Sequence, residues 1–424
     1  MIVFREVTMG FRGKMLFLSV HGDPLAKLGK IQSGGQNVYV RELVKALDSL
    51  GIAVDVFTHH SDPQAPNKEP LGKNSQVIRL PAGHKGFKPK SQMLKLLPRF
   101  LNELKEHIGT GNNYTLIHSN YWLSGWVGLQ LQKSYGIPRV HTSHSLGIVR
   151  KKALDADNPL FSTRLKIEKE VLQKADKVIA TTPLEQKIIA NYYSVKPQKI
   201  SMVPCGVNTK LFRPSENNKA GEILQVDKKI ILFVGRFEEN KGLPVLLKAL
   251  DILKKNHPAT LAEAMLVIVG GDSLDTPPEE LSPEKKRYLK FIQEKGLSER
   301  IIFAGPVQHK ELPSWYSGAW VTVVPSYYES FGLVAVEAMA CGCPVIASRT
   351  GGLQQNVLHG KTGLLVEPKN PKDLAIALNY LLTNERARNE MARQAALHGE
   401  KYSWEKTTSD LLAIYKGVAD ERRN

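Results

Sequence analysis

The sequence predicts an α/β protein made of two doubly wound domains that face each other across a cleft. Short apolar, β-branched runs alternate with helical patterns, which is typical of parallel βαβ units. The alternation pauses at a cluster of turn residues near position 205 and restarts at position 229. The chain of 424 residues is also too long for one average domain. Ligands of such folds bind at the carboxyl ends of the strands, so we expect the site in the cleft.

The first domain is assigned to residues 1–205. It begins with a buried apolar run, and residues 33–37 then open a helical pattern that continues over 38–50 and ends at Gly51. Apolar runs of strand length recur along this half, and we expect strands at 15–20, 53–58, 116–118, 139–143 and 177–181.

The second domain is assigned to residues 206–404. We expect its strands at 229–234, 264–269, 301–304 and 320–325. The last of these runs precedes a helical pattern that begins after Phe331 and stops near Gly342 and Pro344.

The charge balance points to anionic partners. Lysine and arginine total 58 against 41 aspartate and glutamate residues, so the net charge is +17. Such a field attracts nucleotide sugars, sugar phosphates, nucleic acid or anionic lipid headgroups. A basic stretch from Lys85 through Lys88 to Arg99 is either a solvated face or a contact for phosphates or a membrane surface. No recognisable nucleic-acid-binding module is present, so we expect no nucleic-acid partner.

Cysteine usage and the N-terminal residues favour a cytoplasmic protein. Cys205, Cys341 and Cys343 are too few for a disulfide framework, and they lack the fourth ligand and the spacing of a zinc site. The first 14 residues show neither the apolar region nor the cleavage site of a secretory signal. No stretch approaches the length of a transmembrane span.

Two glutamates carry the most specific signal. Glu329 falls in the loop between an expected strand and a helix, and Glu337 follows about two turns later. Gly332 lets backbone amides approach a ligand closely at the helix start. A sugar nucleotide suits this arrangement, since amides and one carboxylate can hold sugar hydroxyls and the other carboxylate a ribose diol. The alternative is a helix with two solvated glutamates, which the Phe331-Gly332-Leu333 insert disfavours.

Two cations follow the strand expected at 229–234. Arg236 and Lys241 lie in a Gly-Arg-x₄-Lys-Gly run, where fixed cations can stabilise a leaving diphosphate. Taken alone, they are also compatible with surface charges. Gly34 and Gly35 precede a helix N-terminus, whose amides and dipole favour the same anion. This pair is a weak motif, and the absence of Gly-x-Gly-x-x-Gly there argues against a dehydrogenase.

Histidines follow two of the expected strands. A single histidine in such a position, for example His118, is more often structural. The repeated placement at strand ends favours a functional role for His144. Trp122 and Trp126 are four residues apart and are more typical of helix packing than of a stacking platform.

Together these motifs resemble the retaining glycosyltransferases of the GT-B fold, in the group known as family 4. The Glu-x₇-Glu and Gly-Arg-x₄-Lys-Gly segments carry the resemblance, which extends from Met15 to the last helix. It implies two Rossmann-like domains, of which the first binds the acceptor and the second the nucleotide sugar. The run around Trp404 resembles the point where such chains cross back, so residues 405–424 are expected to complete the first domain.

Two branches of this group are similar to the chain. Ser33-Gly34-Gly35-Gln36 and His144-Ser145 resemble sucrose-phosphate synthases. Asn37-Val-Tyr39 and the run after His118 resemble the enzyme that glycosylates inositol phosphate in mycothiol synthesis. Both branches imply a phosphorylated small-molecule acceptor, and the resemblance assigns its phosphate to Tyr121, Ser145 and Arg164. We also expect acceptor contacts from Gln36 and Asn37 and from the basic stretch that contains Lys88 and Arg99.

The resemblance also implies a mechanism that retains the anomeric configuration. The diphosphate leaves toward Arg236 and Lys241, and one of its oxygens takes the proton of the attacking hydroxyl, with no covalent carboxylate intermediate. Four residues are thereby expected to be catalytic, namely His144, Arg236, Lys241 and Glu329. The donor is expected to contact Gly34, Gly35, Arg236, Lys241, Glu329, Phe331, Gly332, Leu333 and Glu337.

No metal or other cofactor is expected. Asp155-Ala-Asp157 is similar to the metal-binding Asp-x-Asp of another glycosyltransferase fold, but it follows no clear strand and is interpreted as a loop.

The favoured function is glucose transfer from a nucleoside-diphosphate glucose to fructose 6-phosphate, which gives sucrose 6-phosphate. UDP-glucose is favoured over ADP-glucose, although the sequence leaves the base and the oligomeric state open. The alternatives are transfer to inositol phosphate, transfer to a lipid acceptor at a membrane surface, and a non-catalytic sensor of sugar nucleotides, which the retained polar residues disfavour.

Overall fold

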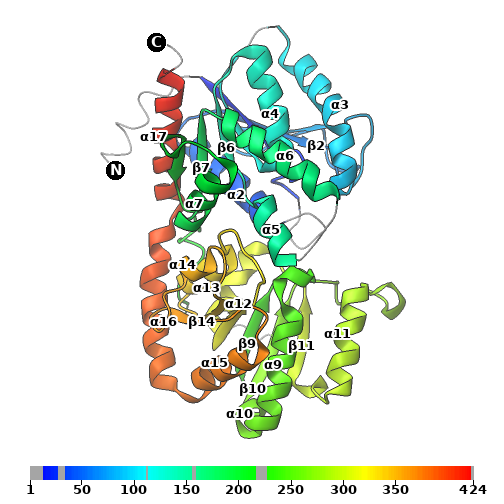
Figure 1. The fold of residues 1–424 in the computed structure, drawn as a ribbon. Helices are drawn as coiled ribbons and strands as arrows, with labels where there is room; N and C mark the ends of the chain where they lie inside the picture. The colour runs from blue at the N-terminus through cyan, green and yellow to red at the C-terminus, as the bar shows by residue number, and fades with distance from the viewer. Residues whose placement is uncertain (1–12, 27–33, 111–112, 155–158, 216–226, 422–424) are drawn as a thin grey trace. The chain divides into compact units, whose positions relative to one another are not determined.

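The computed structural model describes residues 13–26, 34–110, 113–154, 159–215 and 227–421. The chain divides into two compact units. Unit 1 takes the chain up to Gly206 together with the segment from Trp404 onward, and unit 2 is Val207–Ser403. Each unit is a sheet of mostly parallel strands with helices packed against it (Figure 1), so the predicted α/β class with two doubly wound sheets is confirmed.

Unit 1 contains an eight-stranded sheet in the order β3-β4-β2-β1-β5-β6-β7-β8. Neighbouring strands are parallel, except that β3 pairs with β4 in the antiparallel sense at the edge. Pro70 lies in this edge strand, where a proline is tolerated. The strands are β1 (Lys14–Leu18), β2 (Val54–His59), β3 (Lys68–Pro70), β4 (Gln76–Leu80), β5 (Tyr114–Asn120), β6 (Arg139–Thr142), β7 (Lys177–Ala180) and β8 (Ile200–Met202).

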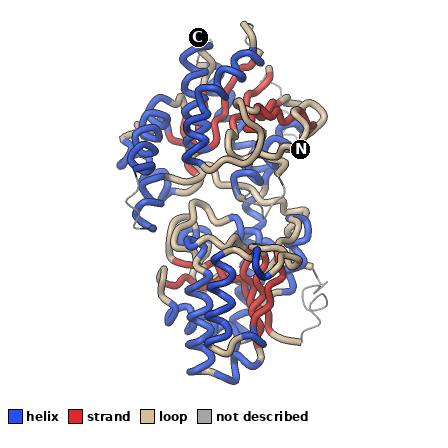
Figure 2. The backbone as a smooth tube through the Cα atoms, turned by 90° about the vertical axis from the view of Figure 1, so that its right-hand side faces the viewer, coloured by secondary structure: helices blue, strands red, loops and turns tan. Residues whose placement is uncertain are grey.

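The helices of unit 1 bury apolar faces against this sheet and against one another. Helix α4 packs against α3 and α6, and the C-terminal helix α17 packs against α2. The separate helix and strand segments can be followed in Figure 2. The helices are α2 (Gly35–Ser49), α3 (Lys90–Ile108), α4 (Tyr121–Tyr135), α5 (Gly147–Leu154), α6 (Pro159–Lys174), α7 (Pro183–Tyr193) and α17 (Trp404–Asp420).

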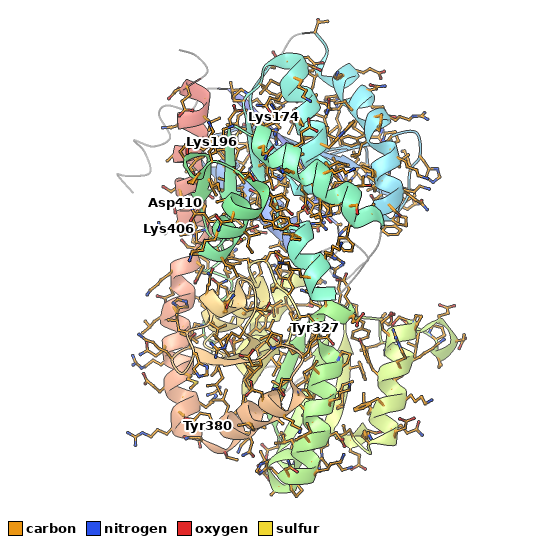
Figure 3. The ribbon with its side chains drawn as sticks, in the orientation of Figure 1. Lys174, Lys196, Tyr327, Tyr380, Lys406 and Asp410 are labelled. Atoms are coloured by element: carbon orange, nitrogen blue, oxygen red, sulfur yellow. The ribbon has the colours of Figure 1, made fainter. Side chains whose placement is uncertain are left out.

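A buried hydrogen bond fixes α17 to the sheet of unit 1. The hydroxyl of Tyr415 lies 2.7 Å from Nδ1 of His118, and Nε2 of His118 lies 2.9 Å from Oγ1 of Thr142. Both His118 and Tyr415 are fully buried. The solvent side of α17 instead carries the ion pair of Lys406 and Asp410, with 3.1 Å between Nζ and Oδ2 (Figure 3). The last helix of the chain is therefore part of the core of unit 1.

The buried His118 is expected to make folding sensitive to acid. Burial, with a smaller contribution from the neighbouring His144, lowers the pKa of His118 to about 3, whereas an unfolded histidine titrates near pH 6.5. The unfolded state therefore binds the extra proton first, and stability falls as the pH drops from about 6.5 toward 3. At pH 5.5 the loss from this one residue is about 1.4 kcal/mol.

This expectation is measured by urea denaturation at pH 7.5 and pH 5.5. The urea concentration at the unfolding midpoint of the wild type should be lower at pH 5.5 than at pH 7.5. This decrease should be smaller in His118→Gln, whatever the starting stability of that variant. An equal decrease in both proteins would show that His118 does not stay neutral in the folded state.

Unit 2 contains a six-stranded parallel sheet in the order β11-β10-β9-β12-β13-β14. Its strands are β9 (Lys229–Val234), β10 (Ala264–Val269), β11 (Ile301–Gly305), β12 (Val321–Val324), β13 (Val345–Ser348) and β14 (Gly363–Val366). Its helices are α9 (Leu243–Asn256), α10 (Pro258–Ala262), α11 (Pro283–Glu294), α12 (Leu312–Gly318), α13 (Leu333–Ala340), α14 (Leu353–Asn356), α15 (Pro371–Thr383) and α16 (Glu385–Gly399).

The strand order of unit 2 brings two distant segments together. Strand β12 pairs with β9, so the segments that follow these two strands leave the same edge of the sheet side by side. The core behind them is apolar, and α9 and α15 pack against each other over it. This topology places the Gly-Arg-x₄-Lys-Gly run next to the loop that carries Glu329.

Candidate active site

Lys241 and Glu329 meet at the carboxyl edge of the unit 2 sheet. Lys241 ends the 3₁₀ turn Glu239–Lys241 after β9, and Glu329 lies between β12 and α13. Nζ of Lys241 lies 2.7 Å from Oε2 of Glu329, and the two side chains are 23% and 22% exposed. The structure thus brings together two residues predicted to hold the donor, and both remain accessible to a ligand.

Gly242 permits the close approach of these two segments. Its φ of +73° is a conformation that favours glycine, and a Cβ atom at this position would lie 1.9 Å from the carbonyl oxygen of Pro325. The loop after β12 is also held by its backbone, because the amide of Tyr327 donates to the carbonyl of Asn240 over 2.8 Å. Tyr327 is labelled in Figure 3, and Nζ of Lys369 lies 4.8 Å from the centre of its ring.

Arg236 has a different partner. Its Nη1 lies 2.7 Å from Oε1 of Glu238, and the two side chains are about one-third exposed at 34% and 37%. An anionic ligand must therefore compete with Glu238 for the guanidinium. The structure does not pair Arg236 with Glu329.

The start of α13 presents backbone donors. Gly332 has φ +91° and caps the helix without a side-chain hydrogen bond. The carbonyl of Gly332 accepts from the amides of Ala335 and Val336, so the amide of Leu333 precedes the first helical bonds. Phe331 is buried, and its backbone carbonyl accepts a hydrogen bond from Nδ2 of Asn356 over 2.6 Å. A fixed helix N-terminus of this kind can bind hydroxyls or an anion.

Glu337 lies deeper than Glu329. It is 5% exposed, and its Oε1 lies 2.7 Å from Nε2 of His309. Its Oε2 accepts from the hydroxyl of Tyr316 over 3.2 Å, and burial together with Glu337 raises the pKa of Tyr316. A ribose diol would have to use the remaining lone pairs of this carboxylate, so its role stays a prediction. His309 was missed from the sequence, although its position shortly after β11 repeats the strand-end signal of the other histidines.

In unit 1, Tyr121 lies close to two cations at the carboxyl end of β5. Nζ of Lys90 lies 4.9 Å and Cζ of Arg164 lies 5.0 Å from its ring centre. Its hydroxyl accepts from Nη1 of Arg164 over 3.2 Å. Burial alone would raise the pKa of Tyr121, but Lys90, Arg164 and Arg150 lower it. The surroundings of this ring are therefore strongly cationic.

Arg164 is buried, whereas the sequence alone indicated an ordinary surface charge. It is 4% exposed, and its Nη2 donates to the backbone carbonyl of Ser145 over 2.6 Å. The structure therefore brings together Tyr121, Ser145 and Arg164, the three residues that the resemblance assigns to the acceptor phosphate.

The basic residue next to this cluster is Lys90. Arg99, which was predicted for this role, is 67% exposed, and its Nε lies 3.7 Å from Oε1 of Glu103. Lys88, the other residue predicted in this stretch, is partly exposed. Lys90 belongs to the basic stretch that the sequence analysis identified, and the start of α3 at this residue places its side chain beside Tyr121.

His144 and Tyr121 share an unusual backbone conformation. Their φ values are +55° and +75°, in the region that favours glycine. Such strain persists only where surrounding structure imposes it, and it is often found at functional sites. Nε2 of His144 lies 2.8 Å from Oδ1 of Asn120, and its ring contacts Tyr39 at 4.8 Å between centres. Desolvation lowers the pKa of His144 to about 3, so the ring is neutral at physiological pH.

Gln36 and Asn37 differ in how the structure uses them. Asn37 is 2% exposed, its Oδ1 accepts from the amide of Gly34 over 3.0 Å, and its Nδ2 donates to the carbonyl of Asp23 over 2.7 Å. Gln36 is less buried, and its Nε2 donates to Oγ of Ser19 over 3.1 Å. Asn37 therefore holds the start of α2, which begins at Gly35, while Gln36 stays closer to solvent. Ser33, which opens the predicted motif, lies outside the described residues.

No metal cluster is present among the residues that the structure describes. No group of three or more His, Cys, Asp or Glu side chains lies close enough to hold an ion there. Asp155 and Asp157 lie outside the described residues. The three cysteines are buried and free. In the same described ranges, no helix has both the length and the apolar character needed to cross a membrane.

Two family models match the chain. The model described as "Glycosyltransferase Family 4" matches residues 33–211, and the model described as "Glycosyl transferases group 1" matches residues 214–398. A D-inositol 3-phosphate glycosyltransferase of Paenarthrobacter aurescens is 36% identical, over 95% of this chain and 97% of its own. The chain belongs to the family 4 glycosyltransferases of the GT-B fold. It is therefore a glycosyltransferase enzyme that uses a nucleotide sugar.

Two solved structures are similar over almost the whole chain. A sucrose-phosphate synthase from Thermosynechococcus elongatus is 37% identical, with a TM-score of 0.88 over 97% of this chain and 100% of its own. HepE of Anabaena, solved with UDP-glucose, is 20% identical with a TM-score of 0.69 over 97% and 99% of the two chains, and it supports the fold alone.

Proposed function

We propose that this glycosyltransferase moves glucose from UDP-glucose to fructose 6-phosphate and forms sucrose 6-phosphate. The observation that carries the acceptor class is the cationic cluster of Lys90, Arg164 and Tyr121. A buried guanidinium and an ammonium beside a phenol are suited to a phosphate group, since charge-assisted hydrogen bonds to phosphate are strong.

The choice of fructose 6-phosphate follows from the two residues at the start of α2. Gln36, which the chain shares with sucrose-phosphate synthases by resemblance, is the more exposed of the two. Asn37, the residue similar to the inositol-phosphate branch, is buried and has its amide oxygen and nitrogen bonded within the unit. The similarity to the Thermosynechococcus sucrose-phosphate synthase, 37% identical, supports the same acceptor.

Inositol phosphate is the second candidate acceptor. Relatives described as D-inositol 3-phosphate glycosyltransferases are 36% identical to the chain, and the cationic cluster would accept the phosphate of either compound. The two candidates thus share the anion and differ in the sugar hydroxyls.

For the donor, we assign the diphosphate to Arg236 and Lys241. Both follow β9, and both are exposed enough to exchange their carboxylate partners for a ligand. Positive charge fixed at this point stabilises the leaving diphosphate and would contribute about 2–4 kcal/mol to the transition state. Glu329, Phe331, Gly332 and Leu333 are assigned to the glucose hydroxyls and Glu337 to the ribose.

The proposed reaction retains the anomeric configuration. The C–O bond between glucose and the diphosphate breaks, the acceptor hydroxyl attacks from the same face, and its proton passes to an oxygen of the leaving diphosphate. No enzyme carboxylate bonds to the sugar. We place this reaction in the cytoplasm, because the three cysteines are free and buried.

The reaction is expected to proceed without a metal ion, since protein cations are assigned to the diphosphate. Turnover in 5 mM EDTA should equal turnover in buffer alone. A loss that Mn²⁺ or Mg²⁺ restores would contradict this expectation and direct attention to Asp155 and Asp157.

The proposal is tested by a donor and acceptor screen. UDP-glucose and ADP-glucose are each incubated with fructose 6-phosphate and with inositol phosphate, and released diphosphate and product mass are measured. The highest kcat/KM is expected for UDP-glucose with fructose 6-phosphate. A higher value with inositol phosphate would replace the first candidate with the second.

A further inference from the structure

Glu168 is a buried carboxylate directly behind the acceptor cluster. It lies on α6 and is 3% exposed. Its Oε1 accepts from Nε of Arg164 over 2.6 Å, and its Oε2 accepts from the hydroxyl of Tyr193 over 2.6 Å. The backbone amide of Gly147 donates to the same carboxylate, with 2.8 Å to Oε2. One carboxylate thus connects α6, the start of α5 and the end of α7.

These bonds control how Arg164 points. The guanidinium donates three hydrogen bonds: from Nε to Glu168, from Nη1 to the hydroxyl of Tyr121 and from Nη2 to the carbonyl of Ser145. Nη1 and Nη2 each carry a second hydrogen that none of these three bonds uses. A planar guanidinium can present such hydrogens to a phosphate in a bidentate manner.

The same carboxylate holds the loop that carries Ser145. Gly147 is the first residue of α5, two positions after Ser145, and its amide is anchored on Glu168. A Cβ atom at Gly147 would lie 2.8 Å from Oε2 of Glu168, so the loop and the carboxylate are in close contact. Burial would lower the pKa of Arg164, but Tyr121 and Glu168 raise it, which keeps the guanidinium charged.

We propose that Glu168 is the positioning residue of the acceptor-phosphate site. It does not touch the acceptor; it sets the direction of the Arg164 fork and the place of the Ser145 loop. This inference rests on the proposed acceptor class. Electrostatics alone predicts the opposite effect, because a negative charge beside an anion site weakens anion binding by repulsion. Positioning of Arg164 is inferred to outweigh that repulsion.

The test compares Glu168→Gln with a matched control, Glu185→Gln. Glu185 is also a buried carboxylate of unit 1, 6% exposed, but it accepts from the amide and hydroxyl of Thr181 instead. In Glu168→Gln the KM for fructose 6-phosphate should rise roughly ten-fold or more, as for loss of a hydrogen bond to a charged group. The KM for UDP-glucose should stay within two-fold, and both constants should be unchanged in Glu185→Gln.

A double-mutant cycle separates positioning from general stability. If Glu168 acts through Arg164, adding Glu168→Gln to Arg164→Ala should leave the acceptor KM where Arg164→Ala alone puts it. An acceptor KM that falls in Glu168→Gln would show that charge repulsion dominates, and fully additive effects would show an independent role. Either result overturns the inference.

A readout without turnover distinguishes this inference from the proposed function. Inorganic phosphate should raise the melting temperature of the wild type and of Glu185→Gln, and it should raise that of Glu168→Gln much less. Tyr193→Phe, which removes a donor from the same carboxylate and leaves Arg164 in place, should give an intermediate shift. If no phosphorylated acceptor is used but this order holds, the proposed reaction fails and the role of Glu168 stands. Equal shifts in all variants overturn the role of Glu168 even if sucrose 6-phosphate is made.

Discussion

Replacing Lys241 with alanine should lower kcat/KM for UDP-glucose by roughly 30- to 900-fold, which corresponds to about 2–4 kcal/mol of transition-state stabilisation. Lys241 is the cation that the strand order of unit 2 places 2.7 Å from Glu329, and it is assigned to the leaving diphosphate. Arg236→Ala is expected to lose activity in the same range. Steady-state kinetics with varied donor at saturating acceptor measures both.

The matched control is Lys255→Ala in the same unit. Nζ of Lys255 also lies 2.7 Å from a carboxylate, Oδ2 of Asp251, but this pair is an i,i+4 pair on α9 with the lysine 64% exposed. Such surface pairs contribute little, so its kinetics should match the wild type. Near-normal turnover in both Arg236→Ala and Lys241→Ala would contradict the assignment of the diphosphate.

Lys241 has two conceivable roles, and product inhibition separates them. It could bind the diphosphate, or it could only hold Glu329 in place for the glucose hydroxyls. UDP carries the diphosphate but no glucose. We therefore expect the inhibition constant of UDP to weaken in Lys241→Ala and to change little in Glu329→Gln. The reverse order would assign Lys241 to positioning.

The sequence predicted the strands whose side chains are apolar on both faces. The runs at 229–234 and 264–269 coincide with β9 and β10, because strands buried on both faces read as continuous apolar segments. Strands β3, β4, β8, β13 and β14 were not expected, and each has five residues or fewer. Strands β3 and β8 have three residues each and lie at the two edges of their sheet, so they offer too few positions for a periodic pattern. Strands β7 and β12, with four residues each, were predicted because their apolar runs are unbroken.

Site residues that belong to a local sequence motif were predicted, whereas contacts that depend on the packing of distant segments were not. Glu329 and Lys241 lie 88 positions apart and were found through their motifs, but their ion pair depends on β12 lying beside β9. The burial of Arg164 and the choice of Lys90 depend on how α6 and α3 pack, which no local pattern encodes. Glu168 looked like one more helix charge, since its partners Gly147 and Tyr193 come from other helices.

The second large effect concerns the acceptor, which must carry a phosphate. Each hydrogen bond to a charged group contributes about 1.5–3 kcal/mol, so loss of the contacts of Lys90, Tyr121 and Arg164 should make unphosphorylated fructose poorer than fructose 6-phosphate by orders of magnitude. Arg164→Ala and Lys90→Ala should each raise the acceptor KM or lower turnover, while the KM for UDP-glucose stays near the wild-type value, because Arg236, Lys241 and Glu329 belong to unit 2.

Lys95→Ala provides the control for this second prediction, since Lys95 lies on the same helix α3 and is exposed. If the cluster acts through specific contacts, Lys95→Ala should leave the acceptor KM unchanged, whereas a general effect of net positive charge would make Lys90→Ala and Lys95→Ala alike. The measurement compares fructose with fructose 6-phosphate, and inositol with its phosphate, for the wild type and the three variants. Equal use of the unphosphorylated sugar by the wild type would refute the phosphate site, and the cations around Tyr121 would then need a different anionic partner, with a lipid headgroup the first to test in vesicles.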